Sequence, residues 1–276
     1  MTLHQLPIAN KERVIIVGAG IGGLAASLRL SHMGYNVKVF ETAETAGGKL
    51  RTITGQTGEI DIGPTVLTLL PVFQNLFRSV GEDIFDHIEL VRQKIIARHW
   101  WPDGETLDLY DDFESSRDAI LNFSGPESAK EFEKYFYDTR DLFSCFDIPV
   151  MQNPNPSMLD MNRAVLNNPK ILFKMHPLRT LSGLLNYKFR DKRLQQLFGR
   201  YATYVGGSPL ESPALLSLIW QAEARGVWSV KGGMKKLARV LEKLAADRGA
   251  SFHYNTEVKN LNISYLTRKE KIVASK

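Results

Sequence analysis

The sequence has little cysteine, no paired histidines and no long uncharged apolar run. A single cysteine, Cys145, among 276 residues excludes a disulfide framework and a zinc cluster. The six histidines show no paired ligand spacing, so we predict no metal site. The longest uncharged apolar stretch, residues 14–28, is interrupted by glycines and is shorter than the roughly 18 residues that a membrane-spanning helix needs. We therefore expect a cytoplasmic protein without a transmembrane helix.

Charge is unevenly distributed, although the net charge is only +5. Residues 103–147 contain 13 acidic and 4 basic residues, whereas residues 170–200 contain 8 basic residues and 1 acidic residue. Such blocks usually form solvated faces. Apolar side chains interleave the basic block, and that mixture also suits an anionic membrane surface. No recognition-helix, zinc-finger or RNA-binding pattern accompanies the charge, so we expect no nucleic-acid partner.

The first fifty residues predict a strand–helix–strand unit that binds a dinucleotide. Residues 14–17 are a continuous apolar run, which is typical of a parallel strand buried on both faces. The sequence GAGIGG follows at residues 18–23, and a helical pattern then runs to Gly34. A second strand is predicted at residues 37–40, with Glu41 at its end. This is the order of elements in which a G-x-G-x-x-G pattern binds a dinucleotide.

Each glycine of this pattern has a physical reason. Gly18 permits the tight turn, Gly20 lets the backbone approach a pyrophosphate, and Gly23 lets helix and strand pack closely. The helix N-terminus offers free N–H groups to the phosphates. Glu41 stands where a carboxylate accepts hydrogen bonds from both ribose hydroxyls, and its charge disfavours the 2′-phosphate of NADP. NAD and FAD remain as ligands.

A second glycine pair favours FAD. Gly47 and Gly48 are followed by two cations, Lys49 and Arg51. A nicotinamide dehydrogenase does not require such a segment, whereas the longer flavin dinucleotide needs a second close approach of the backbone and nearby positive charge. Residues 60–66 (IDIGPTV) then predict a strand that turns at Gly-Pro beneath the ligand.

These segments resemble the amino-terminal part of the carotenoid desaturases, FAD enzymes whose glutathione-reductase-like flavin domain also occurs in amine oxidases. Three later blocks are similar to the subgroup that acts on hydroxylated acyclic carotenoids, the hydroxyneurosporene (methoxyneurosporene) 3,4-desaturases: GRYATYVGGSP at 199–209, GVW at 226–228 and GGM at 232–234. The resemblance covers residues 13–261. It implies FAD as cofactor and an acyclic carotenoid, hydroxylated or phytoene, as substrate. The terminal electron acceptor, oxygen or a quinone, stays open.

The resemblance also implies a set of site residues. The positions that match the family's cofactor-binding residues are Gly18, Gly20, Gly22, Gly23, Glu41, Gly48, Lys49, Arg51, Thr65, Val66 and Val258. Arg200, Tyr201 or Tyr204 is a candidate for contact with substrate or flavin, with structural packing as the alternative. No side chain is identified as a general base, and no hydrolytic triad is indicated.

The expected fold is mixed α/β. We expect a glutathione-reductase-like FAD-binding Rossmann domain at residues 1–66 that resumes at 226–263. Between these segments, residues 67–225 are expected to form an inserted, largely helical domain that holds the substrate and faces the membrane. Residues 264–276 are an atypical tail. Because family members are much longer, we expect a chain truncated at the C-terminus, with an unpaired sheet edge and exposed apolar faces.

Several local elements can be predicted as well. Residues 99–109 predict a hairpin that turns at Pro-Asp-Gly. Residues 127–146 predict an amphipathic helix whose aromatic stripe lines either a core or a polyene channel, and the four tryptophans are expected in the core. Residues 234–245 predict a helix that stops at Gly249, and residues 251–258 predict a strand.

Three functions are compatible with the sequence. Carotenoid desaturation leads, because a flavin can accept the hydride that no side chain can accept. Its apolar substrate lives in lipid, so such an enzyme is expected to be peripheral to the inner or chromatophore membrane, with residues 170–200 as the contact surface. An amine-oxidase-type flavin oxidoreductase is the second function. A non-enzymatic lipid escort, like the GDP-dissociation-inhibitor relatives, or a pseudoenzyme is the third.

Overall fold

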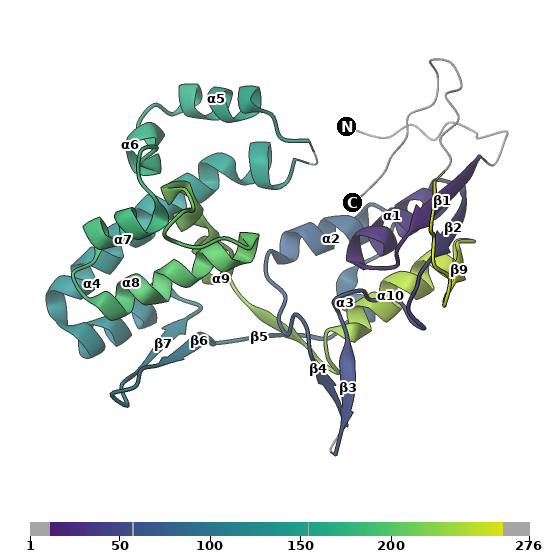
Figure 1. Ribbon diagram of the computed structural model, residues 1–276, viewed down its shortest axis with the longest axis horizontal. Helices are drawn as coiled ribbons and strands as arrows, with labels where there is room; N and C mark the ends of the chain where they lie inside the picture. Colours follow the sequence, from purple (N-terminus) through teal and green to yellow (C-terminus); the bar gives the residue numbers. More distant parts are fainter. Residues whose placement is uncertain (1–11, 57, 154, 262–276) are drawn as a thin grey trace. The chain divides into compact units, whose positions relative to one another are not determined.

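The computed structural model describes residues 12–261, except 57 and 154. The chain divides into two compact units, residues 1–91 with 228–276 and residues 92–227 (Figure 1). Residues 67–91, which the sequence analysis assigned to the inserted region, group with the first unit because their apolar side chains belong to its core. The tail at 264–276 and the first residues of segment 1–66 lie outside the described residues.

The first unit contains the expected strand–helix–strand arrangement. Strands β1 (Arg13–Val17), β2 (Asn36–Phe40) and β9 (Ser251–His253) form a parallel sheet in the order β1-β2-β9. Helix α1 (Ile21–His32) connects β1 to β2 and buries Leu24 and Leu28. The mixed α/β fold class predicted from the sequence is thus confirmed.

Strand β1 differs from its prediction. It is an edge strand, and only one of its faces is covered: Ile16 is buried, whereas Ile15 is 57% and Val17 48% exposed. The apolar run alone could not show this, because a strand covered on one face can carry the same residues as one covered on both. Within residues 12–261, β1 therefore has no second strand beside it and exposes an apolar face.

Helix α10 (Lys235–Ala246) packs against α1 and contributes Leu237, Leu241 and Leu244 to the core. It confirms the predicted helix. Strand β9 is shorter than predicted, since it ends at His253 rather than at residue 258. Asn255 has φ = 51°, in the left-handed region, and therefore ends the extended backbone.

Shorter elements complete the first unit. They are β3 (Thr52–Gly55) and β4 (Gly58–Asp61), which pair antiparallel, then α2 (Leu70–Arg78), α3 (Ile84–His87), and β5 (Leu90–Arg92), which pairs with β8 (Trp228–Val230). The strand predicted at 60–66 ends at Asp61, before the Gly-Pro turn. The backbone of Leu67 hydrogen-bonds that of Trp228 in both directions, at 2.7 and 2.9 Å.

The second unit is mostly helical, and its longest helix is α4 (Phe113–Phe146), which bends where Gly125 leaves the helical region (φ = 84°) before Pro126. The hairpin β6 (Ile95–Trp100)–β7 (Thr106–Tyr110) confirms the predicted turn. The other elements are a π-helix at Asp147–Met151, α5 (Met158–Asn167), α6 (Ile171–Met175), α7 (Leu181–Lys188), α8 (Lys192–Gly199), 3₁₀ helices at Arg200–Val205 and Ala214–Ile219, and α9 (Trp220–Ala224).

The aromatic stripe of α4 belongs to the core of this unit. Phe132 and Tyr135 are at most 1% exposed, and their rings lie 5.8 and 6.1 Å from that of Trp220. The core interpretation of the stripe is therefore correct. The expectation that all four tryptophans are buried is wrong for Trp100, which is 68% exposed at the end of β6.

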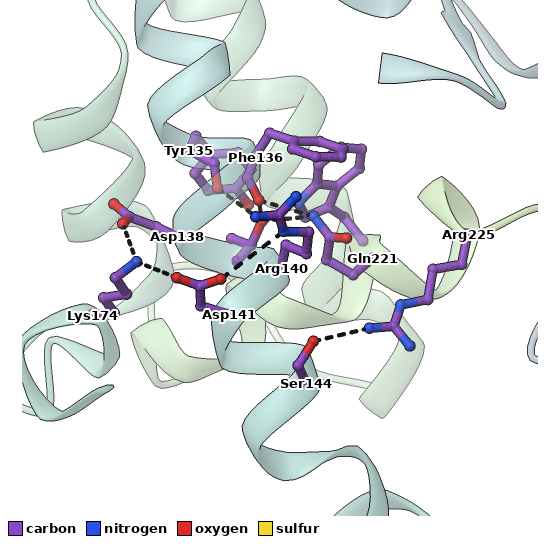
Figure 2. Close-up of polar contacts among 11 residues, drawn as sticks. Tyr135, Phe136, Asp138, Arg140, Asp141, Ser144, Lys174, Gln221 and Arg225 are labelled. Atoms are coloured by element: carbon purple, nitrogen blue, oxygen red, sulfur yellow. Dashed lines mark hydrogen bonds and ion pairs between the residues drawn. The ribbon is translucent and has the colours of Figure 1, made fainter. Parts of the chain in front are cut away.

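Three of the eight cations of the basic block pair with the acidic block. Figure 2 shows Lys174 of α6 between Asp138 and Asp141 of α4, at 3.1 and 2.6 Å. Lys188 of α7 also pairs with Asp138 at 2.6 Å, and Arg190 pairs with Glu131 at 3.4 Å. The two blocks thus form contacts with each other inside the second unit. None of the described helices is long and apolar enough to cross a membrane.

Candidate functional site

The first glycine loop joins the carboxyl end of β1 to the start of α1. Gly18 has φ = 96°, and its N–H donates to the carbonyl of Phe40 at 2.7 Å. A Cβ atom on Gly23 would lie 1.9 Å from the carbonyl oxygen of Gly18. Gly18 therefore provides the tight turn and Gly23 the close packing, the two roles that the sequence pattern assigns to them.

The N-terminus of α1 carries no capping or acidic side chain. Gly20 is the N-cap residue, no side chain caps it, and no acidic residue lies in the first turn. A Cβ on Gly22 would meet nothing within 4 Å, so the protein itself leaves space there. Backbone N–H groups and the positive end of the helix dipole make such a terminus attractive to phosphate groups.

The second glycine pair lies against the first loop. The N–H of Gly47 donates to the carbonyl of Ala19 at 2.9 Å. A Cβ on Gly48 would come within 3.0 Å of the Cα of Gly20. The two glycine segments, which the sequence predicts to contact one ligand, therefore meet in a surface of bare backbone. We call residues 18–20 and 47–48 the glycine cradle.

Glu41 points back at the cradle from the end of β2. Its Oε2 accepts a hydrogen bond from the N–H of Ala19 at 2.6 Å, and its Oε1 accepts one from the N–H of Ala43 at 2.9 Å. The carbonyl of Glu41 accepts a hydrogen bond from the N–H of Thr256 at 2.9 Å, which places the segment just before Val258 beside it. A fixed carboxylate next to a glycine cradle at a helix N-terminus fits the adenosine diphosphate part of FAD.

The other predicted cofactor residues lie further along the same backbone. The side chains of Lys49 and Arg51 are exposed, and no ion pair joins them to a carboxylate in the described ranges. The backbone of Lys49 passes close to Gly63. A Cβ atom added to Gly63 would lie 1.9 Å from the carbonyl oxygen of Lys49. Thr65 and Val66 follow and are exposed, and within residues 12–261 no hydrogen bond ties them to the cradle.

Sequence reasoning missed the role of Asp61. Its Oδ2 accepts a hydrogen bond from the N–H of Met234 at 2.9 Å, and a Cβ on Gly233 would lie 3.2 Å from its carboxylate. Asp61 thus ties the end of β4 to the start of α10. The sequence has an acid, Asp61, shortly before Gly-Pro and a glycine pair before Met234, but no pattern connects two residues that are 173 positions apart.

The second unit holds a buried polar cluster around Glu223, a residue that is 5% exposed. Its Oε2 accepts hydrogen bonds from Arg200 Nη2 at 2.5 Å and from the Tyr201 hydroxyl at 2.7 Å, and its Oε1 accepts one from the Tyr204 hydroxyl. The three residues singled out in the GRYATY block therefore converge on one carboxylate. Tyr201 is fully buried, whereas Tyr204 is 49% exposed.

His99 of β6 lies near this cluster. Burial, and next the positive charge of Arg200, lowers the pKa of His99, so its ring is neutral at physiological pH. Burial likewise raises the pKa of Tyr204, and the hydrogen bond to Glu223 adds to that effect. The sequence analysis did not single out His99 or Glu223, because neither belongs to a recognisable spacing.

Comparison with known proteins identifies the family of the chain. Residues 21–273 match the model of the family described as flavin containing amine oxidoreductase. The chain belongs to this family. The flavin cofactor predicted from the sequence is thus confirmed at the level of the family.

Relatives within this family carry a more specific description. The chain is 44% identical over 246 residues to a hydroxyneurosporene desaturase of Cereibacter sphaeroides, with 89% of this chain and 50% of the relative covered. It is 41% identical to the hydroxyneurosporene desaturase of Rhodobacter capsulatus, with 91% and 51% covered. An oxidoreductase from Methanosarcina mazei has a similar fold, with a TM-score of 0.61 at 18% identity over 91% of this chain and 53% of that one. The chain spans about half the length of the curated relatives that it matches.

Proposed function

We propose that the protein containing this chain is an FAD-dependent carotenoid desaturase. Its substrate is an acyclic carotenoid, hydroxylated as in hydroxyneurosporene or methoxyneurosporene, or phytoene, from which a hydride and a proton are removed. The similarity to hydroxyneurosporene desaturases, 44% identity over 246 residues, carries the proposal. The glycine cradle and Glu41 support it, since they form the kind of surface that a dinucleotide cofactor needs.

In this function the first unit holds the cofactor. FAD supplies the hydride acceptor when it is bound. The N–H groups at the start of α1 bind the diphosphate, and Gly20 and Gly48 let the backbone come close to it. The carboxylate of Glu41, already fixed by two backbone N–H groups, accepts hydrogen bonds from ribose hydroxyls. Lys49 and Arg51 add positive charge near the phosphates.

The Glu41 carboxylate gives a direct test of cofactor binding. Glu41→Ala should remove the yellow flavin from the purified full-length protein, because both backbone anchoring and ribose contacts are lost. Glu44→Ala is the matched control, as Glu44 is an exposed acid three residues away. If Glu41→Ala folds and retains flavin as well as Glu44→Ala does, the proposed cofactor site is wrong.

The activity has its own test. Cells that accumulate hydroxylated acyclic carotenoids should form more conjugated products when they express the full-length protein, so the absorption of the extracted carotenoids should shift to the red. An unchanged spectrum with every acyclic carotenoid would exclude desaturation. Hydrogen peroxide formed from an amine would instead support the amine-oxidase alternative, and tight lipid binding without flavin would support the escort alternative.

A membrane surface is the proposed source of the substrate. Lys174 and Lys188 pair with Asp138 and are therefore less available to a membrane. For this reason we propose that the membrane contact is an apolar surface at and around α5 and α6 rather than the whole basic block. We define this apolar surface by its exposed side chains: Ile148, Met158, Leu159, Leu166, Leu172, Phe173 and Leu178. Phe173 is 80% and Leu178 99% exposed. We propose that these side chains form one contiguous patch, the kind of surface that marks an interaction site, and that cations of the basic block contact anionic headgroups beside it.

Vesicle binding tests the membrane contact. Phe173→Ser with Leu178→Ser should weaken co-sedimentation of the protein with anionic vesicles by about tenfold or more, since each buried apolar side chain contributes roughly 1.5–3 kcal/mol. Ile53→Ser changes an equally apolar side chain, 51% exposed in the first unit, and should leave binding unchanged. Equal binding by both proteins would exclude the apolar surface as the membrane contact.

A further inference from the structure

Asp61 carries a carboxylate that forms no ion pair within the described ranges. Its Oδ2 accepts a hydrogen bond from the N–H of Met234 at 2.9 Å. Its Oδ1 is buried and has no hydrogen-bond partner among residues 12–261. Because a charge is costly to remove from water without a partner of opposite charge, a carboxylate at this position needs a physical reason.

The start of α10 provides that reason. No side chain of this helix caps its N-terminus, and its first turn has no acidic residue, whereas Lys235 and Lys236 stand there. An acidic group stabilises a helix N-terminus, because that end carries the positive pole of the helix dipole. Asp61 supplies the missing acid from the end of β4, and a Cβ atom on Gly233 would lie only 3.2 Å from its carboxylate. Gly233 therefore makes room for the acid.

Helix α10 in turn packs against the glycine cradle. Ala238 follows Met234 by one helical turn on the same face, and both residues are at most 4% exposed. A Cβ atom added to Gly47 would lie 3.7 Å from the Cβ of Ala238, so Ala238 occupies the space beside Gly47. The position of α10 therefore determines how the protein supports the cradle at Gly47.

The strand end at Asp61 also runs beside the segment that carries the predicted cofactor cations. Asp61 lies opposite Thr52 in the register of β3 and β4. The N–H of Ile62 donates to the carbonyl of Arg51 at 2.9 Å. One carboxylate thus connects the backbone next to Arg51 with the start of α10.

We propose that Asp61 is a positioning residue of the cofactor site: its hydrogen bond to Met234 fixes α10 against the glycine cradle and so increases the affinity for FAD. This inference rests on the proposed function and adds a residue to its cofactor site. Asp61 acts through α10, without contact with the cofactor. The GGM block at 232–234 gains a role as well, since Gly233 admits the carboxylate and Met234 donates to it.

The affinity of the full-length protein for FAD tests this role. The dissociation constant is measured by quenching of flavin fluorescence, on proteins whose fold is checked by circular dichroism. Asp61→Ala leaves the Met234 N–H without its acceptor and should raise the dissociation constant about tenfold or more. Asp61→Asn keeps an oxygen that can accept from Met234, so its dissociation constant should stay within about threefold of the unmodified value.

Glu59→Gln is the matched control. Glu59 lies on the same strand as Asp61 and pairs with Arg239 of the same helix at 3.4 Å, but both of its partners in this ion pair are exposed. Exposed ion pairs contribute little, so this variant should bind FAD as the unmodified protein does.

Amide hydrogen exchange gives a second measurement that needs no variant. Coupling between two events is reciprocal, so a hydrogen bond that strengthens FAD binding is itself strengthened when FAD is bound. The amide of Met234 in the full-length protein should therefore exchange about tenfold more slowly with FAD than without it. An exchange rate that FAD leaves unchanged overturns the role of Asp61, even if Asp61→Ala fails to fold.

The outcomes separate this role from the proposed function. An Asp61→Ala protein that folds and binds FAD as tightly as Glu59→Gln overturns the role and leaves the cofactor site standing. An Asp61→Asn protein that binds as weakly as Asp61→Ala also overturns it, because the hydrogen bond to Met234 would then not determine the affinity. If the unmodified protein binds no FAD, the proposed function is wrong, and the role of Asp61 with it.

Discussion

Substitution of Gly23 gives the most direct test of the packing beneath the cofactor loop. In Gly23→Ala the new Cβ would lie 1.9 Å from the carbonyl oxygen of Gly18, whereas ordinary contacts begin at 3.4 Å, so α1 or the loop must move by about 1.5 Å. Forcing extra atoms into a packed core typically costs about 1–3 kcal/mol. The obstructing atom belongs to the backbone and cannot rotate away.

Gly22→Ala is the matched control on the same turn of α1. Its Cβ would meet nothing within 4 Å, and alanine is favoured over glycine in a helix by up to about 1 kcal/mol. Both variants gain this helix propensity, so Gly23→Ala should unfold at a lower urea concentration than Gly22→Ala by the packing cost alone, a gap of about 1–3 kcal/mol in the free energy of unfolding of the first unit. Far-ultraviolet circular dichroism follows both transitions. Equal stability of the two variants would refute the close approach of helix and strand at Gly23.

Two further predictions concern the second unit. The Arg193 guanidinium holds the pKa of Asp191 at about 2, below its ordinary 3.8, so this carboxylate stabilises the fold above pH 3.8 and the contribution disappears as the pH falls towards 2. In acid titrations followed by circular dichroism, Asp191→Asn should lose less stability over that range than the unmodified protein. An equal loss in both proteins would contradict the pairing of Asp191 with Arg193. Thr139→Val removes the Oγ1 that accepts from Trp220 at 2.7 Å and from Gln221 at 3.0 Å. The buried Trp220 N–H is then left unpaired, whereas Gln221 Nε2 keeps its hydrogen bond to the Phe136 carbonyl at 3.2 Å, so the urea stability should fall by about 1–3 kcal/mol. A variant as stable as the unmodified protein would show that the Thr139 hydroxyl is dispensable.

The strand–helix–strand part of the first unit could be predicted from the sequence, because the residues that shape it act on their immediate neighbours. The glycines between β1 and α1, the stop at Gly34 and the acid after β2 each act within a few residues, and the structure has the elements where the pattern places them. The cofactor roles of these residues stay predictions, which the variants above test.

Features that depend on distant segments could not be predicted. The exposure of Ile15 follows from the position of β1 at the edge of the sheet, which no periodicity encodes. The basic block at 170–200 suggested a charged face, whereas Lys174 and Lys188 pair with an acid on α4. Glu223 lies in an ordinary helical sequence, and only the fold brings it to Arg200.

The placement of the second unit within the chain has a consequence for synthesis on the ribosome. The first unit needs α10 and β9 to complete its core and its sheet, and both are translated after the whole of residues 92–227. Residues 12–91 therefore keep part of their apolar surface open to solvent or to a chaperone while residues 92–227 are translated. The nascent protein is accordingly most prone to aggregation during translation of its middle, and slowing the ribosome there should lower the yield more than slowing it near either end.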